Sequence, residues 1–239
     1  MPDVLLVGLI AKRPDLTVEQ MNAHWRGVHG PLVCAATPRL RPKYIQNHLR
    51  DTRVPGFPDS HYDGFAEVWF PGFDQIPGLE PGPVLTDAEQ RAEQAFRDDE
   101  RNFADPSNCS CAFVDEHSIV GERSPLPEGG AKALLFLTAG EPSAQGSSAV
   151  LLAERMPGEL PGGWAMLGVA IVGASVSPGV AAMGGVTGLD AVLEVALPSR
   201  AAFDAYWSAN GEGLIAALAA LPARYRPFFG ALVAEVPMR

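Results

Sequence analysis

The chain is short of positive charge. It has 18 lysine and arginine residues against 28 aspartate and glutamate residues, which gives a formal net charge of -10 at pH 7. A nucleic-acid-binding protein normally carries a basic face, and attraction to an anionic membrane also needs positive charge. We therefore expect neither nucleic acid nor a membrane among its partners. With 47% hydrophobic and 19% charged residues, the composition is typical of a folded globular protein.

Long hydrophobic runs and paired cysteines are also scarce. The nearest candidate for a membrane span, residues 164–176, is about half of the ~20 residues required, and the N-terminal segment lacks a secretory-signal pattern. Of the three cysteines, Cys109 and Cys111 alternate onto one side of a predicted strand, where a disulfide between them is awkward. These features predict that the protein is located in the reducing cytoplasm. Because Cys109-x-Cys111 has no second Cys or His pair, we predict no zinc site.

The first half of the sequence predicts strands and helices in the order β-α-β-β-α-β. Strands are expected at residues 4–10, 42–49, 64–70 and 109–116. Thr17 and Thr86 each open a helix with a capping box, Thr-x-x-Gln and Thr-x-x-Glu. The first helix is expected to stop at Gly30-Pro31 and the second near Arg101. This order is that of the ferredoxin-like fold, in which both helices cover one face of an antiparallel sheet.

The second half repeats this order with different side chains. Strands are expected at 133–137, 164–176, 189–197 and 228–236, with helices at 147–156, 200–207 and 213–221. The segment AEVWF at 66–70 has a counterpart in LEVAL at 193–197, which indicates an internal duplication. We predict an α+β chain of two ferredoxin-like repeats, at 1–124 and 131–239, joined by a linker at 125–130. Two sheets stacked face to face would bury the faces that the helices leave open.

Histidine is absent after residue 117. The five histidines are His24, His29, His48, His61 and His117. Since histidine transfers protons most readily near neutral pH, any chemistry is expected in the first half. At ~100° per residue, His24 and His29 would flank opposite edges of the apolar stripe of their helix. They would not lie side by side, so we do not expect them to share a metal ion. The acidic run at 98–100 is interpreted as a solvated helix end.

His29, His48 and Tyr44 are the candidate catalytic residues. His29 lies beside the Gly-Pro turn and is the first candidate for a general acid or base; the alternative is a helix C-cap. His48 shares a strand face with Tyr44 and Gln46, and a Tyr-His pair can polarise a carbonyl and move a proton. The alternative for these three residues is a satisfied polar ladder on the sheet.

Trp25, Phe65, Glu67, Trp69 and His61 are the candidate ligand-binding residues. Glu67 lies between the two aromatic residues of its strand, where burial would raise its pKa. Glu194 occupies the matching place in the second half, which favours a structural role for Glu67 instead. Trp25 is more typical of a core residue, and His61 lies in a loop that could close over a ligand. The pattern does not show which strand face lines the cleft.

Four segments of the first half together resemble the EthD family. They are HWRGVHGPLV at 24–33, YIQNH at 44–48, DGFAEVWF at 63–70 and DDERNF-x-D at 98–105. The resemblance covers most of residues 4–117 and implies the dimeric α/β-barrel superfamily, with both sheets supplied here by one chain. The second half departs from the motif, with Leu151-Leu152 and Met156-Pro157-Gly158 in the corresponding places.

The resemblance implies several activities. Relatives look like lyases, isomerases, cyclases and dehydratases that use no cofactor and act on aromatic polyketides or lactones. We therefore expect an acid/base enzyme without cofactor or metal, acting on a small hydrophobic carbonyl compound. One alternative is a non-catalytic binding or accessory protein of an oxidoreductase system that degrades ethers or aromatic compounds; another is a haem-binding barrel. The tandem could close its own barrel as an intrachain pseudo-dimer or exchange halves with a second chain as a homodimer.

Overall fold

Eight antiparallel strands form one closed barrel. The computed structural model describes residues 4–78, 82–140, 147–171 and 189–238. The strands follow one another around the barrel in the order β1-β3-β2-β8-β5-β7-β6-β4. Their bounds are β1 Val4–Ile10, β2 Lys43–Asp51, β3 Gly64–Phe70, β4 Ser110–Val120, β5 Ala131–Thr138, β6 Trp164–Ala170, β7 Ala191–Leu197 and β8 Arg226–Pro237.

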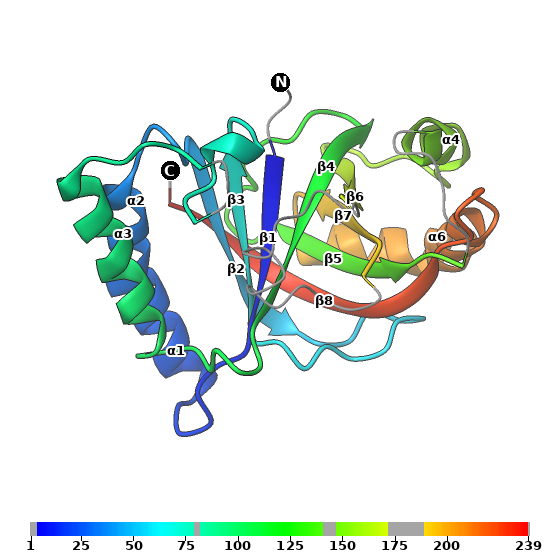
Figure 1. Cartoon of the computed structure of the whole chain (residues 1–239). Helices are drawn as coiled ribbons and strands as arrows, with labels where there is room; N and C mark the ends of the chain where they lie inside the picture. Colours follow the sequence, from blue (N-terminus) through cyan, green and yellow to red (C-terminus); the bar gives the residue numbers. More distant parts are fainter. Residues whose placement is uncertain (1–3, 79–81, 141–146, 172–188, 239) are drawn as a thin grey trace.

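Helices cover the barrel on two opposite sides (Figure 1). One layer contains α1, the π-helical turn η1, α2 and α3, and the other contains α4 and α6. Their bounds are α1 Val18–His24, η1 Trp25–His29, α2 Gly30–Ala36, α3 Asp87–Glu100, α4 Ser147–Arg155 and α6 Arg200–Ala219, with a short 3-10 turn, η2, at Phe73–Gln75. Both predicted capping boxes are present, at Thr17 and Thr86. None of the helices in the described part of the chain has the length and apolar character needed to cross a membrane.

The two sheets are joined at their edges. β2 pairs with β8, and β4 pairs with β6, both antiparallel. The expected barrel is therefore present, and the two sheets do more than stack face to face: their edge strands satisfy their free N–H and C=O groups by pairing across the halves. One chain supplies every strand of the closed barrel.

Several predicted element boundaries need correction. The first helical segment does not stop at Gly30-Pro31 but continues as α2. The two short helices predicted at 200–207 and 213–221 are one helix, α6, because Gly211 packs on Trp207 inside it. β6 ends at Ala170, and most of the remainder of the strand predicted to reach residue 176 lies outside the described residues.

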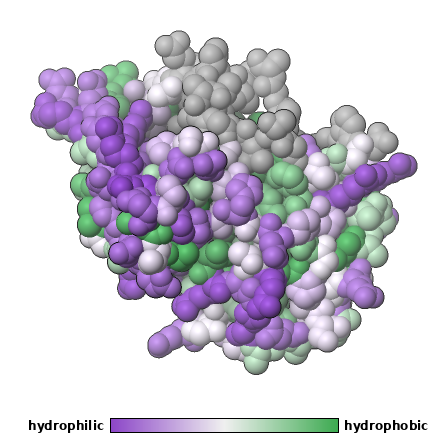
Figure 2. Space-filling view, turned by 90° about the horizontal axis from the view of Figure 1, so that it is seen from below, coloured by the Kyte–Doolittle hydropathy of each residue, from purple (hydrophilic) through white to green (hydrophobic). Residues whose placement is uncertain are grey.

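Apolar side chains fill much of the barrel interior. Alternation along β3 directs Phe65 and Trp69 inward, where they join an apolar cluster with Leu134 and Phe136 of β5. The rings of Phe65 and Phe136 lie 5.2 Å apart. Outside the barrel, hydrophobic side chains lie in patches among hydrophilic ones on the face shown in Figure 2.

A buried charge cluster connects the two halves inside the barrel. Lys132 Nζ lies 2.9 Å from Glu67 Oε1, 3.3 Å from Glu194 and 3.4 Å from Glu235. Arg123 contacts both oxygens of Glu194, at 2.9 and 2.6 Å. Burial and the neighbouring Glu194 raise the pKa of Glu67. Although burial opposes it, Arg123 lowers the pKa of Glu194. Glu67 and Glu194 are thus held by the same two cations.

Replacement of Lys132 should destabilise the barrel strongly. Lys132→Met leaves buried carboxylates without their cation, and we expect a loss of about 3–5 kcal/mol in the free energy of unfolding. Because the folded-state pKa of Glu67 already lies above its ordinary value of 4.5, its ionisation opposes folding as pH rises. Without Lys132 this ionisation becomes more costly still. The loss in the free energy of unfolding should therefore be larger at pH 8 than at pH 5, as measured by urea denaturation.

The control for this experiment is Arg53→Met, which removes an exposed ion pair with Asp51. Exposed pairs contribute little to stability, so the unfolding midpoint should stay where it is. A Lys132→Met variant as stable as the wild type at pH 8 would show that the cluster does not need this cation.

Candidate functional site

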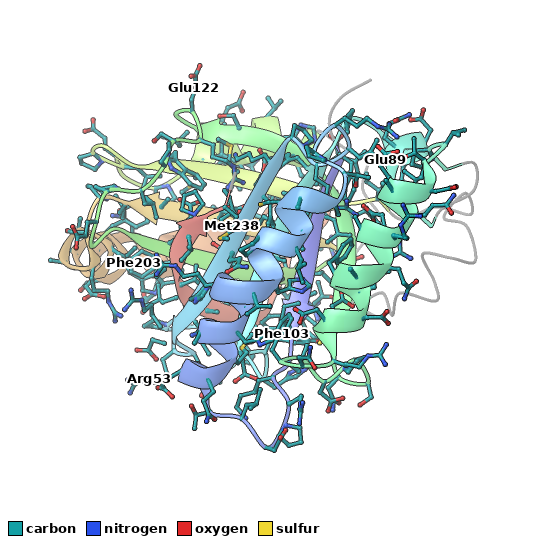
Figure 3. All side chains as sticks on the ribbon, turned by 90° about the vertical axis from the view of Figure 1, so that its left-hand side faces the viewer. Arg53, Glu89, Phe103, Glu122, Phe203 and Met238 are labelled. Carbon is teal, nitrogen blue, oxygen red and sulfur yellow. The ribbon has the colours of Figure 1, made fainter. Side chains whose placement is uncertain are left out.

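A cavity of about 480 Å³ lies between the first helical layer and the outer face of the barrel. Its walls include side chains from η1, α2 and α3 on one side and from β1, β3 and β4 on the other. Figure 3 shows α1 to α2 and α3 side by side over the strands, with Phe103 between them. Polar groups of His29, Tyr44 and Glu100 line this cavity, as do Arg41, Arg97 and Ser110, and the rest of the lining is largely apolar.

Small residues on the sheet make room for the cavity. Gly8 of β1 pairs with Ala66 of β3, and both line it. At the same register positions in the second half, Leu135 of β5 pairs with Leu193 of β7. These two leucines belong to an apolar core cluster beneath α4 and α6. The sheet face that is hollow in the first half is therefore filled by leucine side chains in the second.

A π-helical turn at Trp25–His29 connects α1 to α2. Pro31 lacks the N–H that would bond to the carbonyl of Gly27, so a regular α-helix cannot pass through this segment. The carbonyl of Trp25 instead accepts from the Gly30 N–H, five residues later, and from Gln46 Nε2 at 2.9 Å. Turns of this kind are rare and often lie at functional sites.

The π turn brings His24 and His29 to one carboxylate. His24 Nε2 lies 2.9 Å from Asp99 Oδ1, and His29 Nδ1 lies 3.1 Å from Asp99 Oδ2. The expectation that these histidines would not lie side by side was wrong, because it assumed about 140° between them in a regular helix. Asp99 was also misjudged as part of a solvated helix end: it is buried and also accepts from Asn102 at 2.9 Å.

The proton positions on His29 follow from Asp99. The hydrogen bonds from Asn102 and His24 lower the pKa of Asp99, although burial opposes them. An ionised carboxylate only accepts hydrogen bonds, so His29 donates from Nδ1. Burial, only partly offset by Asp99, lowers the pKa of His29 to about 4. At neutral pH, His29 is therefore a neutral imidazole whose lone pair lies on Nε2, and it lines the cavity.

The Tyr44 hydroxyl is held so that its proton is available for a hydrogen bond to a ligand. Its oxygen accepts from Trp25 Nε1 at 3.0 Å and from Gln46 Nε2 at 3.1 Å. Burial raises the pKa of Tyr44, so the hydroxyl stays protonated at neutral pH. Since both acceptor positions are used, the remaining capacity of this hydroxyl is to donate. Tyr44 lines the same cavity as His29.

His48 supports this arrangement from outside the cavity lining. Its Nε2 lies 3.0 Å from Gln46 Oε1, and its ring stacks on Trp25 at 5.1 Å. The predicted polar face of β2 is thus a connected set, with Tyr44 at the cavity and His48 behind Gln46 and Trp25. Burial lowers the pKa of His48 to about 4.

Glu100 is a titratable group of the cavity that the sequence analysis did not identify. It follows Asp99 at the end of α3 and lines the cavity, where its side chain remains accessible. The surrounding protein atoms, and secondarily the Asp99 charge, raise the pKa of Glu100 to about 7, against the opposing effect of Arg97. Glu100 therefore exists in both protonation states near neutral pH.

The other predicted binding residues lie elsewhere. Phe65, Glu67 and Trp69 point into the barrel, on the face of β3 opposite to the cavity, whereas Ala66 and Val68 line it. His61 is exposed and lies against Tyr62, with ring centres 4.0 Å apart. Of the five candidate binding residues, Trp25 is the one that lines this cavity.

Comparison with protein families identifies the first half. The EthD domain model matches residues 13–107, which include His24, His29, Tyr44 and Asp99. This match confirms the resemblance to the EthD family that the four sequence segments give for the first half. Comparison with curated proteins gives no significant match.

Solved structures share the fold of the whole chain. A "putative monooxygenase" from Lactobacillus acidophilus has a TM-score of 0.51 at 10% identity, with 100% of this chain and 95% of that chain covered. An anthrone oxidase-like protein has a TM-score of 0.56 at 11% identity, covering 99% and 93%. A "putative monooxygenase" from Fusobacterium nucleatum has a TM-score of 0.55 at 9% identity, also covering 99% and 93%. At such low identities these likenesses show a common fold alone.

Gly64 should be intolerant of a side chain. A Cβ atom at Gly64 would lie 2.5 Å from Trp25 Cζ3, and the indole cannot move without losing its contacts with Tyr44 and His48. We expect Gly64→Ala to cost about 1–3 kcal/mol and to change the near-UV circular dichroism of the tryptophans.

Gly27→Ala provides a matched control, because no atom lies within 4 Å of a Cβ atom built there. This variant should be neutral or slightly stabilising. If both glycine variants unfold at the same urea concentration, Trp25 is not locked in place as described.

Proposed function

We propose that the chain is an acid/base enzyme that removes a proton next to the carbonyl group of a small hydrophobic compound. The observation that carries this proposal is the neutral His29, with Nδ1 held by Asp99 at 3.1 Å and its lone pair available in a largely apolar cavity. A base fixed in one tautomer by a carboxylate is a recurrent device of proton transfer.

The proposed reaction begins with a proton moving from carbon to Nε2 of His29. The electron pair of the broken C–H bond moves onto the carbonyl oxygen, and the Tyr44 hydroxyl donates a hydrogen bond to the resulting oxyanion. The imidazolium formed on His29 is stabilised by Asp99 through Nδ1. Protonated Glu100 then supplies a proton to a leaving hydroxyl, in a dehydration, or to a different carbon, in an isomerisation.

The substrate class is inferred from the cavity. Trp25, Phe70, Phe96 and Phe103 are among its walls, which suits a flat aromatic or lactone compound. A volume of about 480 Å³ lies within the usual range for small-molecule sites. Some solved structures of similar fold are named as monooxygenases or as oxidase-like. By fold-level analogy, a second reaction of the carbanion formed by proton removal is oxygenation, with dioxygen as the co-substrate.

We also propose that the chain is a tandem of two ferredoxin-like repeats, residues 1–124 and 131–239, joined at 125–130 into an intrachain pseudo-dimer. Each half runs β-α-β-β-α-β. The strand orders β4-β1-β3-β2 and β8-β5-β7-β6 correspond position by position. On this proposal the second repeat has kept the fold and lost the site.

Removal of the His29 base should abolish turnover. His29→Asn keeps an N–H close to the position of Nδ1 for Asp99 but removes Nε2, so we expect kcat to fall about 10²- to 10⁴-fold with little change in stability. Aromatic ketones and lactones that quench tryptophan fluorescence would first be selected as ligands, and their turnover followed by mass spectrometry. His117→Asn, on β4 outside the cavity lining, is the matched control.

Two results would overturn the proposal. One is a His29→Asn variant that retains full activity on a compound the wild type converts. The other is a Soret band on addition of haemin that His29→Asn abolishes, since Nε2 would then be an axial haem ligand rather than a base. Compounds that bind and are never converted would favour the accessory protein instead.

Glu100 should set the alkaline limit of activity. With His29 titrating at about 4 and Glu100 at about 7, the active form has a neutral His29 and a protonated Glu100. We expect kcat/KM to decline above about pH 7, and Glu100→Gln to lower kcat and remove that decline. An unchanged alkaline limb in Glu100→Gln would assign it to another group.

A further inference from the structure

His24 occupies a place that the proposed reaction does not use. It is the last residue of α1, and its side chain is 27% exposed, whereas the side chains of Asp99 and His29 are 9% and 7% exposed. Its ring stacks on Phe103, with centres 5.7 Å apart. Phe103 also contacts the ring of His29 at 4.8 Å. One carboxylate and one aromatic ring therefore lie against both histidines.

The carboxylate is shared between donors. Asp99 Oδ1 lies 2.9 Å from His24 Nε2 and accepts from Asn102 Nδ2, also at 2.9 Å, and Oδ2 lies 3.1 Å from His29 Nδ1. Since an ionised carboxylate only accepts, His24 donates from Nε2, and its Nδ1 can take a second proton. His24 then becomes a cation that contacts the charge on which His29 depends.

We propose that His24 is a positioning residue that acts through Asp99: by taking its second proton it draws the carboxylate's charge away from His29 and weakens the base. This inference rests on the role proposed for His29. Opposite charges within ~4–6 Å of a group favour its charged form, so a cation that partly cancels Asp99 disfavours the imidazolium form of His29. Consistent with this, the charge of His24 contributes to lowering the pKa of His29.

Other charged groups line the cavity beside this pair. On α3, Arg97 and Glu100 line it next to Asp99, and Arg41 lines it from the segment that precedes β2. On the sheet side, Cys109 and Cys111 line the cavity, and burial raises the pKa of both thiols to about 11, so they are neutral near pH 7. Glu100 also changes its charge near Asp99, but His24 is the one of these two groups that contacts the carboxylate directly.

The consequence is a site whose base is weakened when His24 takes up its second proton. When His24 gains this charge, His29 loses part of the support of Asp99. The two titrations are then coupled, and neither belongs to one residue alone. A merely structural His24 would leave the titration of His29 unaffected.

The test is an NMR titration of the full-length protein with 15N-labelled histidine, from neutral pH to about pH 3, with signals assigned from single variants. His24→Gln keeps an N–H for Asp99 and removes the second charge, so the titration midpoint of His29 should rise by on the order of one pH unit. His24→Phe keeps an aromatic ring against Phe103 and also removes the charge, so the titration midpoint of His29 should rise in this variant too. His117→Gln should leave it unchanged.

The proposal is overturned if the midpoint of His29 is the same in wild type, His24→Gln and His24→Phe. This result would not affect the proposed function, which fails separately if His29→Asn keeps its turnover. Where a converted substrate is available, the acid limb of kcat/KM should move in the same direction as the NMR midpoint in His24→Gln. A limb that stays in place while the midpoint moves would also refute the role of His24 in the reaction.

Discussion

The site depends on the carboxylate of Asp99. It fixes His29 in the tautomer with Nε2 unprotonated, contacts His24 and ties α3 to the π-helical segment across the helical layer. Without an ionised acceptor at this point, two imidazoles and an amide would meet with no group to bond to. The π turn and this carboxylate act together. The turn brings two histidines five residues apart onto one side of the helical segment, and their hydrogen bonds to the shared carboxylate stabilise that arrangement.

Carboxylates inside the barrel and at the cavity have different surroundings. In the interior, Glu67 and Glu194 are neutralised by Lys132 and Arg123, as expected for charges that must be paired to be buried. At the cavity, Glu100 has no cation within ion-pair distance among the described residues and keeps an elevated pKa. Paired charges are typical of structure, and a titratable group left poised near neutrality in a cavity is typical of a functional site.

Much of the secondary structure followed from local sequence, whereas the site did not. Capping boxes at Thr17 and Thr86 and the alternation along β3 act over a few residues, so they could be predicted. The π turn could not, because Gly30-Pro31 has the pattern of a helix end. That error placed His24 and His29 apart. Asp99 was taken for a surface charge for a different reason, since its burial depends on contacts with residues about 70 positions away in the chain.

The location of the site in one half follows from packing. Two halves with the same strand order each place a layer of helices over one face of the sheet. In each half, the side chains between helices and sheet either fill this space or leave a cavity. Leu135 and Leu193 fill one layer, and Gly8 and Ala66 leave the other open. The open layer keeps two apolar clusters between its helices and the sheet, and the Asp99 network and the stacking of His48 on Trp25 add to them. His24, His29 and His48 therefore lie in the half where the core is partly open and where their contacts help to hold the helices in place.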